Sequence, residues 1–467
     1  MVKARTLLIA LTCLGATARV FAWAYVHPDL HPDAFFQYWE PAWWHLHGYG
    51  WHSWEWEIGL RSWLLPAYNG AWIAFFEAIG IRNPHHLFRI MLLHWALLSA
   101  AIVPAAWRMG AALQKRFGNA SGSVSVPAFT ALFAAIMPVL IHFSPQTIIE
   151  VPGTLLFVWG YCHWLESRVR FGEAEARSAL WAGLALSLGA CLRIPNGPLA
   201  LVPVLDMLLR RRFRPALACM GAAMIPLGVF AITDWVTWGR PLHSALAFVQ
   251  YNFIEGRAIE HGISPRDQYF DEIRTWLGVA VIPLAILITT QLRRVWPLFL
   301  PAVFLVCLLA TQPHKESRFI LLPWALGTLS AGGALGFIVS ALGRRFGRES
   351  LLRVLGLMFA GGVTIVHARG LTKMPALDYS HKWPVYEAES WAGTQPDLTG
   401  LLVADRLHLS GGWALIGKNV PFEVLHQGTI GNPIFNYAIA PRELDALCLQ
   451  NRMHVVWEKE NFRVWTR

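Results

Sequence analysis

Long apolar runs recur along this sequence from residue 5 to residue 370, and they constrain its fold more than any other feature. Each run has roughly 17–25 residues, the length that an α-helix needs to cross the hydrocarbon core of a bilayer. Charged residues make up only 15% of the 467 residues, whereas soluble proteins contain about 25%. The sequence therefore predicts an all-α polytopic membrane protein over residues 1–370.

We expect about eleven membrane-spanning helices and one further, ambiguous helix. The spans are predicted at 6–26, 87–107, 124–142, 147–165, 178–192, 197–209, 215–235, 276–292, 295–311, 319–341 and 351–368. The first run has the features of a signal peptide, but it continues to Val26, and this length favours a span. The stretch 63–81 is apolar enough either to span or to lie at the interface, and we prefer the interfacial helix.

The basic residues between the apolar runs indicate the orientation of the chain. If 63–81 does not span, the basic clusters lie on the same side as Lys3 and Arg5; they are found at 108–118, 166–177, 210–214, 293–294 and 343–350. That side is the cytoplasm by the positive-inside rule. The net charge of +10 therefore reports membrane topology, and we expect membrane lipid and no nucleic acid as a partner.

Most residues that are capable of chemistry fall on the opposite, non-cytoplasmic face. This face collects the loop 27–86, the turns 142–147 and 193–196, the loop 236–275, the segment 312–319 and everything after residue 370. After residue 370 the long apolar runs stop, and MHVVWEKENFRVW is typical of two strands joined by a turn. We expect a small α/β domain outside the membrane at 371–467.

The loop 27–86 places a few acids among many aromatic residues. Asp33 closely follows the first run and precedes an aromatic cluster. Aromatic side chains exclude water, strengthen local electrostatics and can receive the face of a sugar or an isoprenoid. The alternative is an interfacial aromatic belt in which Asp33 is a solvated charge. Candidate acceptor-binding or sugar-binding residues in this loop are Gln37, Trp39, Glu40, Trp54 and Glu55.

The segment TQPHKESRF gathers four ionisable residues at the mouth of a span. Lys315 and Arg318 are three residues apart and would share one side of a helix. Both suit an anionic headgroup, and arginine can bind phosphate through two hydrogen bonds. Snorkelling at a helix end explains a single cation better than it explains this cluster. His314 is a further candidate.

Two residues outside that segment remain open between a binding role and a structural role. Arg193, in the turn LRIPNGP, is either a second phosphate ligand or a capping cation. Glu150 is expected to be an acid at a helix N-terminus, where the helix dipole favours it.

Motifs for metal, nucleotide or serine-hydrolase chemistry are absent from the sequence. It has no GxxxxGK[ST] loop, GxSxG turn, HExxH pair or paired CxxC motif. The histidines at 27–52 match no metal template. We therefore expect no cofactor and no metal ion.

Several of these segments resemble glycosyltransferase family 22. The stretch HPDAFFQYWEPAWWHLHGYGWHSWEWEIGLRSWLLP is similar to the first outer loop of that family, and HKESRF at 314–319 is similar to its HKExRF signature. LRIPNGP lies where the family has an arginine-containing turn. The resemblance covers residues 5–340. The family contains the dolichyl-phosphate-mannose-dependent α-mannosyltransferases of N-glycan and GPI-anchor assembly.

The resemblance implies a C-superfamily glycosyltransferase fold and an inverting transfer without a nucleotide sugar. The donor would be a polyprenyl- or dolichyl-phosphate sugar, and the acceptor a glycolipid or glycan. Asp33 aligns with the family's catalytic acid, which would make 27–86 the catalytic outer loop. The charge bias fits a bacterial inner membrane as well as an endoplasmic reticulum, and we expect a bacterial member with its active site on the periplasmic or lumenal face.

One departure from the family's pattern leaves alternatives open. The family usually reads HPDE, whereas this sequence reads HPDA, with Ala34 in place of the second acid. Either that acid is dispensable, or Glu40 or Glu55 replaces it, or the substrate differs. Other possibilities are another lipid-phosphate sugar, a catalytically inactive scaffold and a lipid-linked sugar transporter. A transporter would more often place its ionisable groups at the bilayer midplane.

Overall fold

The computed structural model describes residues 2–25, 31–118, 123–373, 383–404, 410–424 and 430–467. The contacts within the chain divide it into two compact units. The helical unit comprises Met1–Val26, Trp95–Pro145 and Ile149–Leu377, and the mixed unit comprises His27–His94, Gln146–Ile148 and Asp378–Arg467. This division differs from the expected one, because the loop 27–86 groups with the C-terminal segment.

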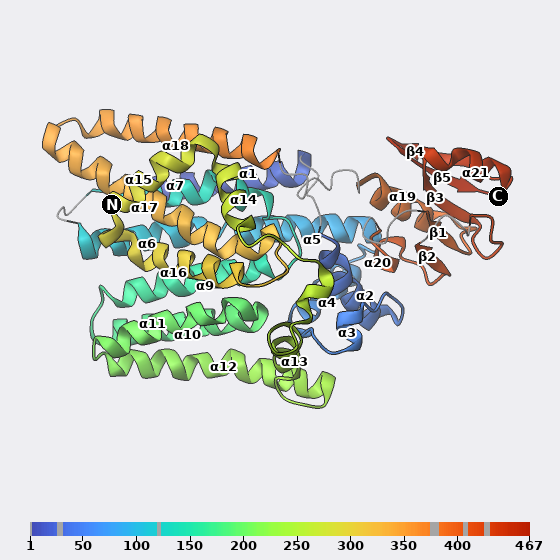
Figure 1. Cartoon of the computed structure of the whole chain (residues 1–467), viewed down its shortest axis with the longest axis horizontal. Helices are drawn as coiled ribbons and strands as arrows, with labels where there is room; N and C mark the ends of the chain where they lie inside the picture. Colours follow the sequence, from blue (N-terminus) through green and yellow to red (C-terminus); the bar gives the residue numbers. More distant parts are fainter. Residues whose placement is uncertain (1, 26–30, 119–122, 374–382, 405–409, 425–429) are drawn as a thin grey trace. The chain divides into compact units, whose positions relative to one another are not determined.

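The helical unit is a bundle of long helices (Figure 1). Its helices are α1 (Val2–Tyr25), the end of α5 (Pro84–Ser99), α6 (Ile102–Phe117), α7 (Ser125–Ile136), α8 (Pro138–His142), α9 (Glu150–Ser167), α10 (Gly172–Leu192), α11 (Gly197–Leu209), α12 (Phe213–Trp238), α13 (His243–Val249), α14 (Gln268–Leu277), α15 (Val281–Thr290), α16 (Leu292–Ala310), α17 (Leu321–Phe346) and α18 (Glu349–Leu371). Each predicted span overlaps at least one of these helices.

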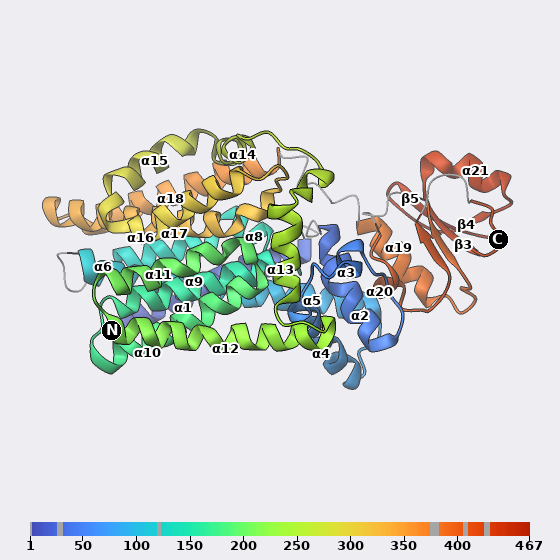
Figure 2. The same ribbon diagram turned by 60° about the horizontal axis from the view of Figure 1, so that its bottom comes forward.

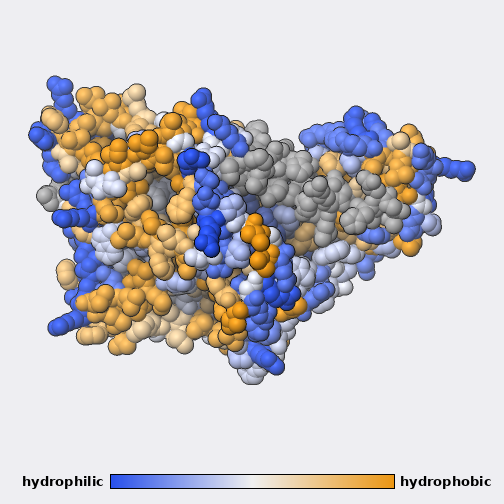
Figure 3. Space-filling model, in the orientation of Figure 1, coloured by the Kyte–Doolittle hydropathy of each residue, from blue (hydrophilic) through white to orange (hydrophobic). Residues whose placement is uncertain are grey.

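Seven helical stretches of the described chain are long and apolar enough to cross a membrane. They are Ala4–Ala24, Pro84–Phe117, Phe213–Trp238, Gln268–Thr290, Leu292–Ala310, Ser317–Phe346 and Glu349–Leu371. Figure 3 shows hydrophobic side chains along the flanks of the bundle and hydrophilic ones where its helices end. The chain is therefore a multi-pass membrane protein, and the exact number of crossings stays a prediction.

Helix α17 lies at the centre of the bundle, and most of its residues are buried. Two glycines one turn apart let it approach α7 closely. A Cβ atom on Gly332 would lie 2.5 Å from the carbonyl oxygen of Phe129, and one on Gly336 would lie 2.5 Å from the Cα atom of Val126. Small residues at this spacing are typical of packed membrane helices. This packing fixes the middle of α17 against α7, and the first residues of α17 lie next to part of the candidate site.

The C-terminal part of the mixed unit contains a five-stranded sheet with the strand order β2-β1-β3-β5-β4. Its strands are β1 (Leu401–Val403), β2 (Phe422–Val424), β3 (Tyr437–Pro441), β4 (His454–Lys459) and β5 (Phe462–Thr466). The strand β1 pairs in parallel with β2 and β3, whereas β5 is antiparallel to β3 and β4. The predicted strand–turn–strand segment forms β4 and β5.

Helices cover this sheet and connect it to the loop 27–94. Residues of α19 (Trp383–Thr394) share one apolar core with the sheet, and Cys448 of α21 (Asp445–Gln450) belongs to a second core. Figure 2 shows α19 and α21 on different sides of the strands. The short helix α20 (Trp413–Ile416) follows a glycine-rich turn. That turn contacts the loop.

The loop contributes a π-helix, η1 (Ala34–Trp39), followed by α2 (Glu40–His47), α3 (Trp54–Glu57) and α4 (Leu64–Ala78). The ring of Phe35 in η1 lies 5.0 Å from that of Tyr386 in α19. Helix α4 has 15 residues and is therefore about 22 Å long, which is shorter than the hydrocarbon core of about 30 Å. Its length agrees with the preferred interfacial helix, although its place at a membrane surface stays a prediction.

Candidate functional site

A buried ionic cluster forms where three helices of the helical unit end or begin. Glu150 is the first residue of α9, Arg193 follows the last residue of α10, and Arg318 lies in the 3-10 helix η6 (Ser317–Ile320) before α17. All three residues are at most 6% exposed. Glu150 Oε1 lies 3.4 Å from Arg193 Nη1, and Glu150 Oε2 lies 3.8 Å from Arg318 Nη1. One carboxylate therefore faces two buried guanidinium groups.

Contacts within the segment 314–319 hold the second arginine in place. Arg318 Nε donates a hydrogen bond of 2.6 Å to Glu316 Oε2, and His314 Nε2 lies 2.9 Å from Glu316 Oε1. The guanidinium carbons of Arg193 and Arg318 lie 4.4 and 5.2 Å from the centre of the Phe319 ring. Cation–π contacts of this kind orient a guanidinium without neutralising it. The Phe319 ring thus orients both arginines, while Glu150 and Glu316 supply their counter-charges.

Lys315 is buried beside this cluster, but it faces a different loop. Its Nζ donates to the carbonyl oxygen of Gln312 at 2.6 Å and to that of Ser264 at 3.5 Å. Burial lowers the pKa of the Lys315 ammonium, and Arg266 lowers it further. Hydrogen bonds to neutral carbonyl groups offset only part of the free energy that it costs to bury a cation. Lys315 therefore adds positive charge at the start of η6.

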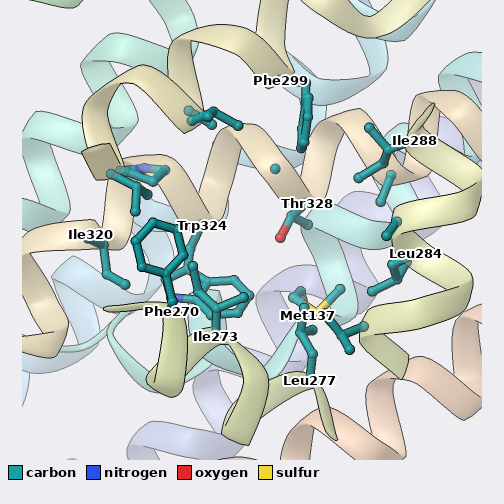
Figure 4. Close-up of a pocket in the computed structure, with 18 of the residues that line it drawn as sticks. Met137, Phe270, Ile273, Leu277, Leu284, Ile288, Phe299, Ile320, Trp324 and Thr328 are labelled. Carbon is teal, nitrogen blue, oxygen red and sulfur yellow. The ribbon is translucent and has the colours of Figure 1, made fainter. Parts of the chain in front are cut away.

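An apolar cavity of about 290 Å³ opens in the same unit, between α14, α15, α16 and α17. Figure 4 shows Phe270, Ile273 and Leu277 of α14 pointing into it, with Ile320 and Trp324 from η6 and α17. Its lining is almost entirely hydrocarbon, which is typical of a site for the apolar part of a ligand. Since η6 and α17 carry both Arg318 and the cavity wall, a charged site and an apolar site adjoin.

Helix α14 also joins the charged residues to the cavity. Gln268 Nε2 donates to Glu272 Oε1 at 2.9 Å and to the carbonyl oxygen of Lys315 at 3.5 Å. Phe270 and Ile273 lie on the cavity side of the same helix. The amphipathic helix thus borders a polar region and an apolar one, as a ligand with a charged head and a hydrocarbon tail requires.

In the mixed unit, Asp33 lies directly before the π-helix η1. Its Oδ1 atom is 3.6 Å from His31 Nδ1, and its side chain is 21% exposed. Asp33 is therefore accessible to a ligand, unlike the buried acids of the same loop. π-helices are rare and occur frequently at functional sites, so the local backbone agrees with a functional role for this segment.

The structure brings together Gln37 and Glu55, two other predicted residues of the loop. Gln37 Nε2 donates a hydrogen bond of 2.8 Å to Glu55 Oε1, and Arg61 Nη2 lies 3.5 Å from the same oxygen. Trp54 is 39% exposed, whereas Trp39 is fully buried. Trp54 is thus largely exposed, and Trp39 packs inside the core.

Glu40 is completely buried, and both of its carboxylate oxygens accept backbone hydrogen bonds. Oε2 accepts from the N–H of Trp51 at 2.6 Å, and Oε1 accepts from the N–H of Ala414 at 2.7 Å. Burial raises the pKa of Glu40 to about 8, although the two hydrogen bonds act in the opposite direction. This geometry favours a role inside the protein over contact with a sugar.

Sequence reasoning missed the partners of one acid, Glu150, and missed a second acid, Glu389, altogether. Glu150 is the acid at a helix N-terminus that the sequence predicts, and it also pairs with both buried arginines, which the sequence does not predict. Glu389 was not singled out, and it is buried against the turn at 410–411. The Gly-Gly pair at 411–412 signals that turn, but nothing in the sequence connects it to Glu389. No group of three or more His, Cys, Asp and Glu residues that would hold a metal ion occurs among the described residues.

Solved structures with this fold are distantly related in sequence. ArnT from Cupriavidus metallidurans superposes with a TM-score of 0.59 at 13% identity, over 97% of both chains. AglB from Archaeoglobus fulgidus superposes with a TM-score of 0.52 at 10% identity, over 95% of this chain and 70% of that one. At such low identity the likeness shows the fold alone, and both neighbours have the C-superfamily fold that the resemblance implies.

Curated relatives are similar over most of this chain. GPI mannosyltransferase 3 of Yarrowia lipolytica is 27% identical over 344 residues, which cover 73% of this chain and 64% of that protein. Alpha-1,2-mannosyltransferase ALG9 of Saccharomyces cerevisiae is 25% identical over 375 residues, covering 76% and 63%. The matched part thus spans slightly less than two thirds of these relatives. The profile of the Alg9-like mannosyltransferase family matches residues 9–382, and the chain belongs to that family.

Proposed function

We propose that this protein is an inverting glycosyltransferase that moves a mannosyl residue from a polyprenyl-phosphate donor to a glycolipid or glycan acceptor on the non-cytoplasmic face. The observation that carries this proposal is the buried arginine pair, which adjoins an apolar cavity through η6 and α17. A lipid phosphate has the same two parts, an anionic head and a hydrocarbon tail. The names of the curated relatives support mannose as the sugar.

In this proposal the arginine cluster binds the donor phosphate. Arg193 and Arg318 pair with Glu150, and Arg318 also pairs with Glu316, so the excess positive charge of this buried region comes from Lys315. Fixed charges in such a site stabilise the negative charge that develops on a leaving phosphate. The ArnT neighbour has been solved with undecaprenyl phosphate, and the AglB neighbour with a dolichol-phosphate, which supports this class of donor.

Asp33 is the proposed general base. It would accept the proton of the acceptor hydroxyl while the sugar carbon is attacked and the bond to the phosphate oxygen breaks. An ordinary aspartate has a pKa of about 3.9, so it is ionised at neutral pH and able to accept a proton late in the reaction. Its exposure and its alignment with the family's catalytic acid support this role.

The proposal is tested with purified protein in lipid vesicles, supplied with radiolabelled polyprenyl-phosphate sugars and membrane lipid from the host. Wild type is compared with Asp33→Asn, which we expect to lower transfer from the mannosyl donor by about 10²–10⁴-fold. Glu57→Gln, in the same loop but exposed, is the control and should transfer normally.

The other outcomes separate the alternatives. Equal transfer by wild type and Asp33→Asn would remove Asp33 from the mechanism. Transfer from a different sugar donor would show that mannose is not the sugar. The departure at Ala34 from the family's pattern is the reason to test other donors. Movement of labelled lipid across the bilayer without any transfer would identify a transporter.

A further inference from the structure

Two fully buried carboxylates contact one glycine-rich turn in the mixed unit. Glu389 Oε1 accepts a hydrogen bond of 2.5 Å from Ser410 Oγ, and its Oε2 accepts one of 2.8 Å from the N–H of Gly411. Glu40 Oε1 accepts from the N–H of Ala414. The turn Ser410–Ala414, called the 410–414 turn below, therefore joins α19 to the loop segment that follows Asp33.

The backbone conformation of the 410–414 turn lets it approach these carboxylates closely. Gly412 has φ +72°, and a Cβ atom there would lie 2.2 Å from Glu40 Oε1. The N–H of Gly412 donates to Ser410 Oγ at 2.9 Å, while that hydroxyl donates to Glu389. Each oxygen of both carboxylates already accepts a hydrogen bond from protein, so a substrate is not needed to satisfy them.

These contacts support the π-helix that follows Asp33. Phe35, in its first turn, lies 5.0 Å from Tyr386 of α19, measured between ring centres. Glu40, the residue directly after its last turn, is tied to Ala414 and to Trp51. The π-helix is thus held at its start and at its end by the C-terminal segment. An uncommon backbone conformation persists only when its surroundings determine it.

We propose that Glu40 and Glu389 are positioning residues, which hold the 410–414 turn against the loop and so fix η1 in the conformation that places Asp33 for the transfer. This inference rests on the proposed role of Asp33. It gives the C-terminal segment a part in the reaction that requires no contact with the acceptor. It also assigns Glu40 to the geometry of the site instead of to sugar binding.

The test measures kinetics and hydrogen exchange on the full-length protein in lipid nanodiscs. Glu389→Gln keeps the shape of the side chain but replaces one of its two acceptor oxygens by an NH2 group, which cannot accept a hydrogen bond. We expect kcat to fall about 10–100-fold while KM for the donor changes little, because misplacement of a catalytic group affects the chemical step. Amide exchange should rise at Gly411 and Ala414 and in η1. Glu387→Gln in the same helix is the control, since its carboxylate pairs with Lys459 on a partly exposed surface.

A second variant distinguishes a loss of positioning from unfolding of the protein. Gly412→Ala keeps both carboxylates but forces a Cβ atom against Glu40, so it should reproduce the fall in kcat with an unchanged thermal unfolding of the helical unit. Glu40→Asp should restore part of the activity lost in Glu40→Ala. Faster exchange in the 410–414 turn together with wild-type kcat would overturn the proposal, and so would unchanged exchange in both variants. Absence of transfer by the wild type would overturn the proposed function, and the positioning role with it.

Discussion

At the scale of single residues, the charges of Glu150, Arg193 and Arg318 depend on one another. The carboxylate of Glu150 lies between the two guanidinium groups, and all three side chains are buried. Burial makes each interaction stronger than it would be in water. The cluster therefore allows predictions that separate phosphate binding from structural pairing.

Arg318→Gln should lower kcat/KM for the lipid-phosphate donor by about 10²–10³-fold, the range for removing one donor of charge stabilisation. Arg318→Lys should have a kcat/KM little higher than that of Arg318→Gln, because an ammonium group lacks the planar pair of N–H donors of a guanidinium group. Initial rates against donor concentration measure both effects. Arg345→Gln, which changes an exposed arginine near the end of the following helix α17, is the matched control. Normal kinetics of Arg318→Gln would exclude the cluster as the phosphate site.

Glu150→Gln should destabilise the free protein and strengthen its response to lipid phosphate. Removing one partner of a buried ion pair costs about 3–5 kcal/mol, and a bound phosphate would replace the missing negative charge. We expect undecaprenyl phosphate to raise the Tm of the variant more than it raises that of the wild type. Glu349→Gln, which disrupts an exposed helix-terminal pair with Arg353, should respond like the wild type. An equal shift in both proteins would argue against competition at the arginines.

At the scale of elements, a buried arginine of α1 donates hydrogen bonds to backbone carbonyl groups at the break between α7 and α8. Helix α7 ends at Ile136 and α8 begins with Pro138, which has no N–H to donate to the carbonyl of Ala134. The guanidinium group of Arg19 donates hydrogen bonds to the carbonyl oxygen of Ala134 at 3.2 Å and to that of Ala135 at 3.4 Å. The arginine is 1% exposed, so it acts as a cap inside the bundle.

Arg19→Met should therefore lower the stability of the helical unit by about 1–3 kcal/mol for each carbonyl left without a partner. Thermal unfolding in detergent measures the loss. Arg5→Met, on the same helix but exposed, is the control and should change the Tm little. A stable Arg19→Met variant would mean that water or backbone rearrangement satisfies both carbonyls.

The helices were predictable because their apolar runs are local and long, and the paired strands β4 and β5 because their residues alternate around a turn. The charged segment 314–319 was predictable because cations are rare on its expected face. Distances between remote residues were not predictable. The hydrogen bond from Ala414 to Glu40 joins residues 374 positions apart, and neither local propensity nor charge pattern contains that information. The pairing of Glu150 with Arg193 and Arg318 was not predictable for the same reason.

At the scale of the whole molecule, the loop 27–94 and the C-terminal segment form one compact unit. Aromatic side chains of the loop pack against the segment, as the contact of Phe35 with Tyr386 illustrates. Two fully buried carboxylates, Glu40 and Glu389, accept hydrogen bonds inside this unit. The mixed unit should therefore respond to pH.

Burial raises the pKa of Glu40 and of Glu389 to about 8, and the charge of Glu40 contributes to the shift in Glu389. The folded state then binds more protons than the unfolded state between pH 4.5 and 8. Stability must fall as the pH rises through that window and then level off. Tyr49, the other titratable group that interacts with Glu40, remains protonated there, because burial and Glu40 raise its own pKa.

We therefore expect the amides of the 410–414 turn to be better protected at pH 6 than at pH 8.5, after correction for intrinsic exchange rates. The double variant Glu40→Gln with Glu389→Gln should lose this dependence, because neither side chain can then release a proton. Glu387→Gln should keep it, since its partly exposed carboxylate lies outside the buried pair. A protection factor that does not change with pH in the wild type would mean that both carboxylates stay ionised, held by their backbone hydrogen bonds. The loop would then be positioned equally well at every physiological pH.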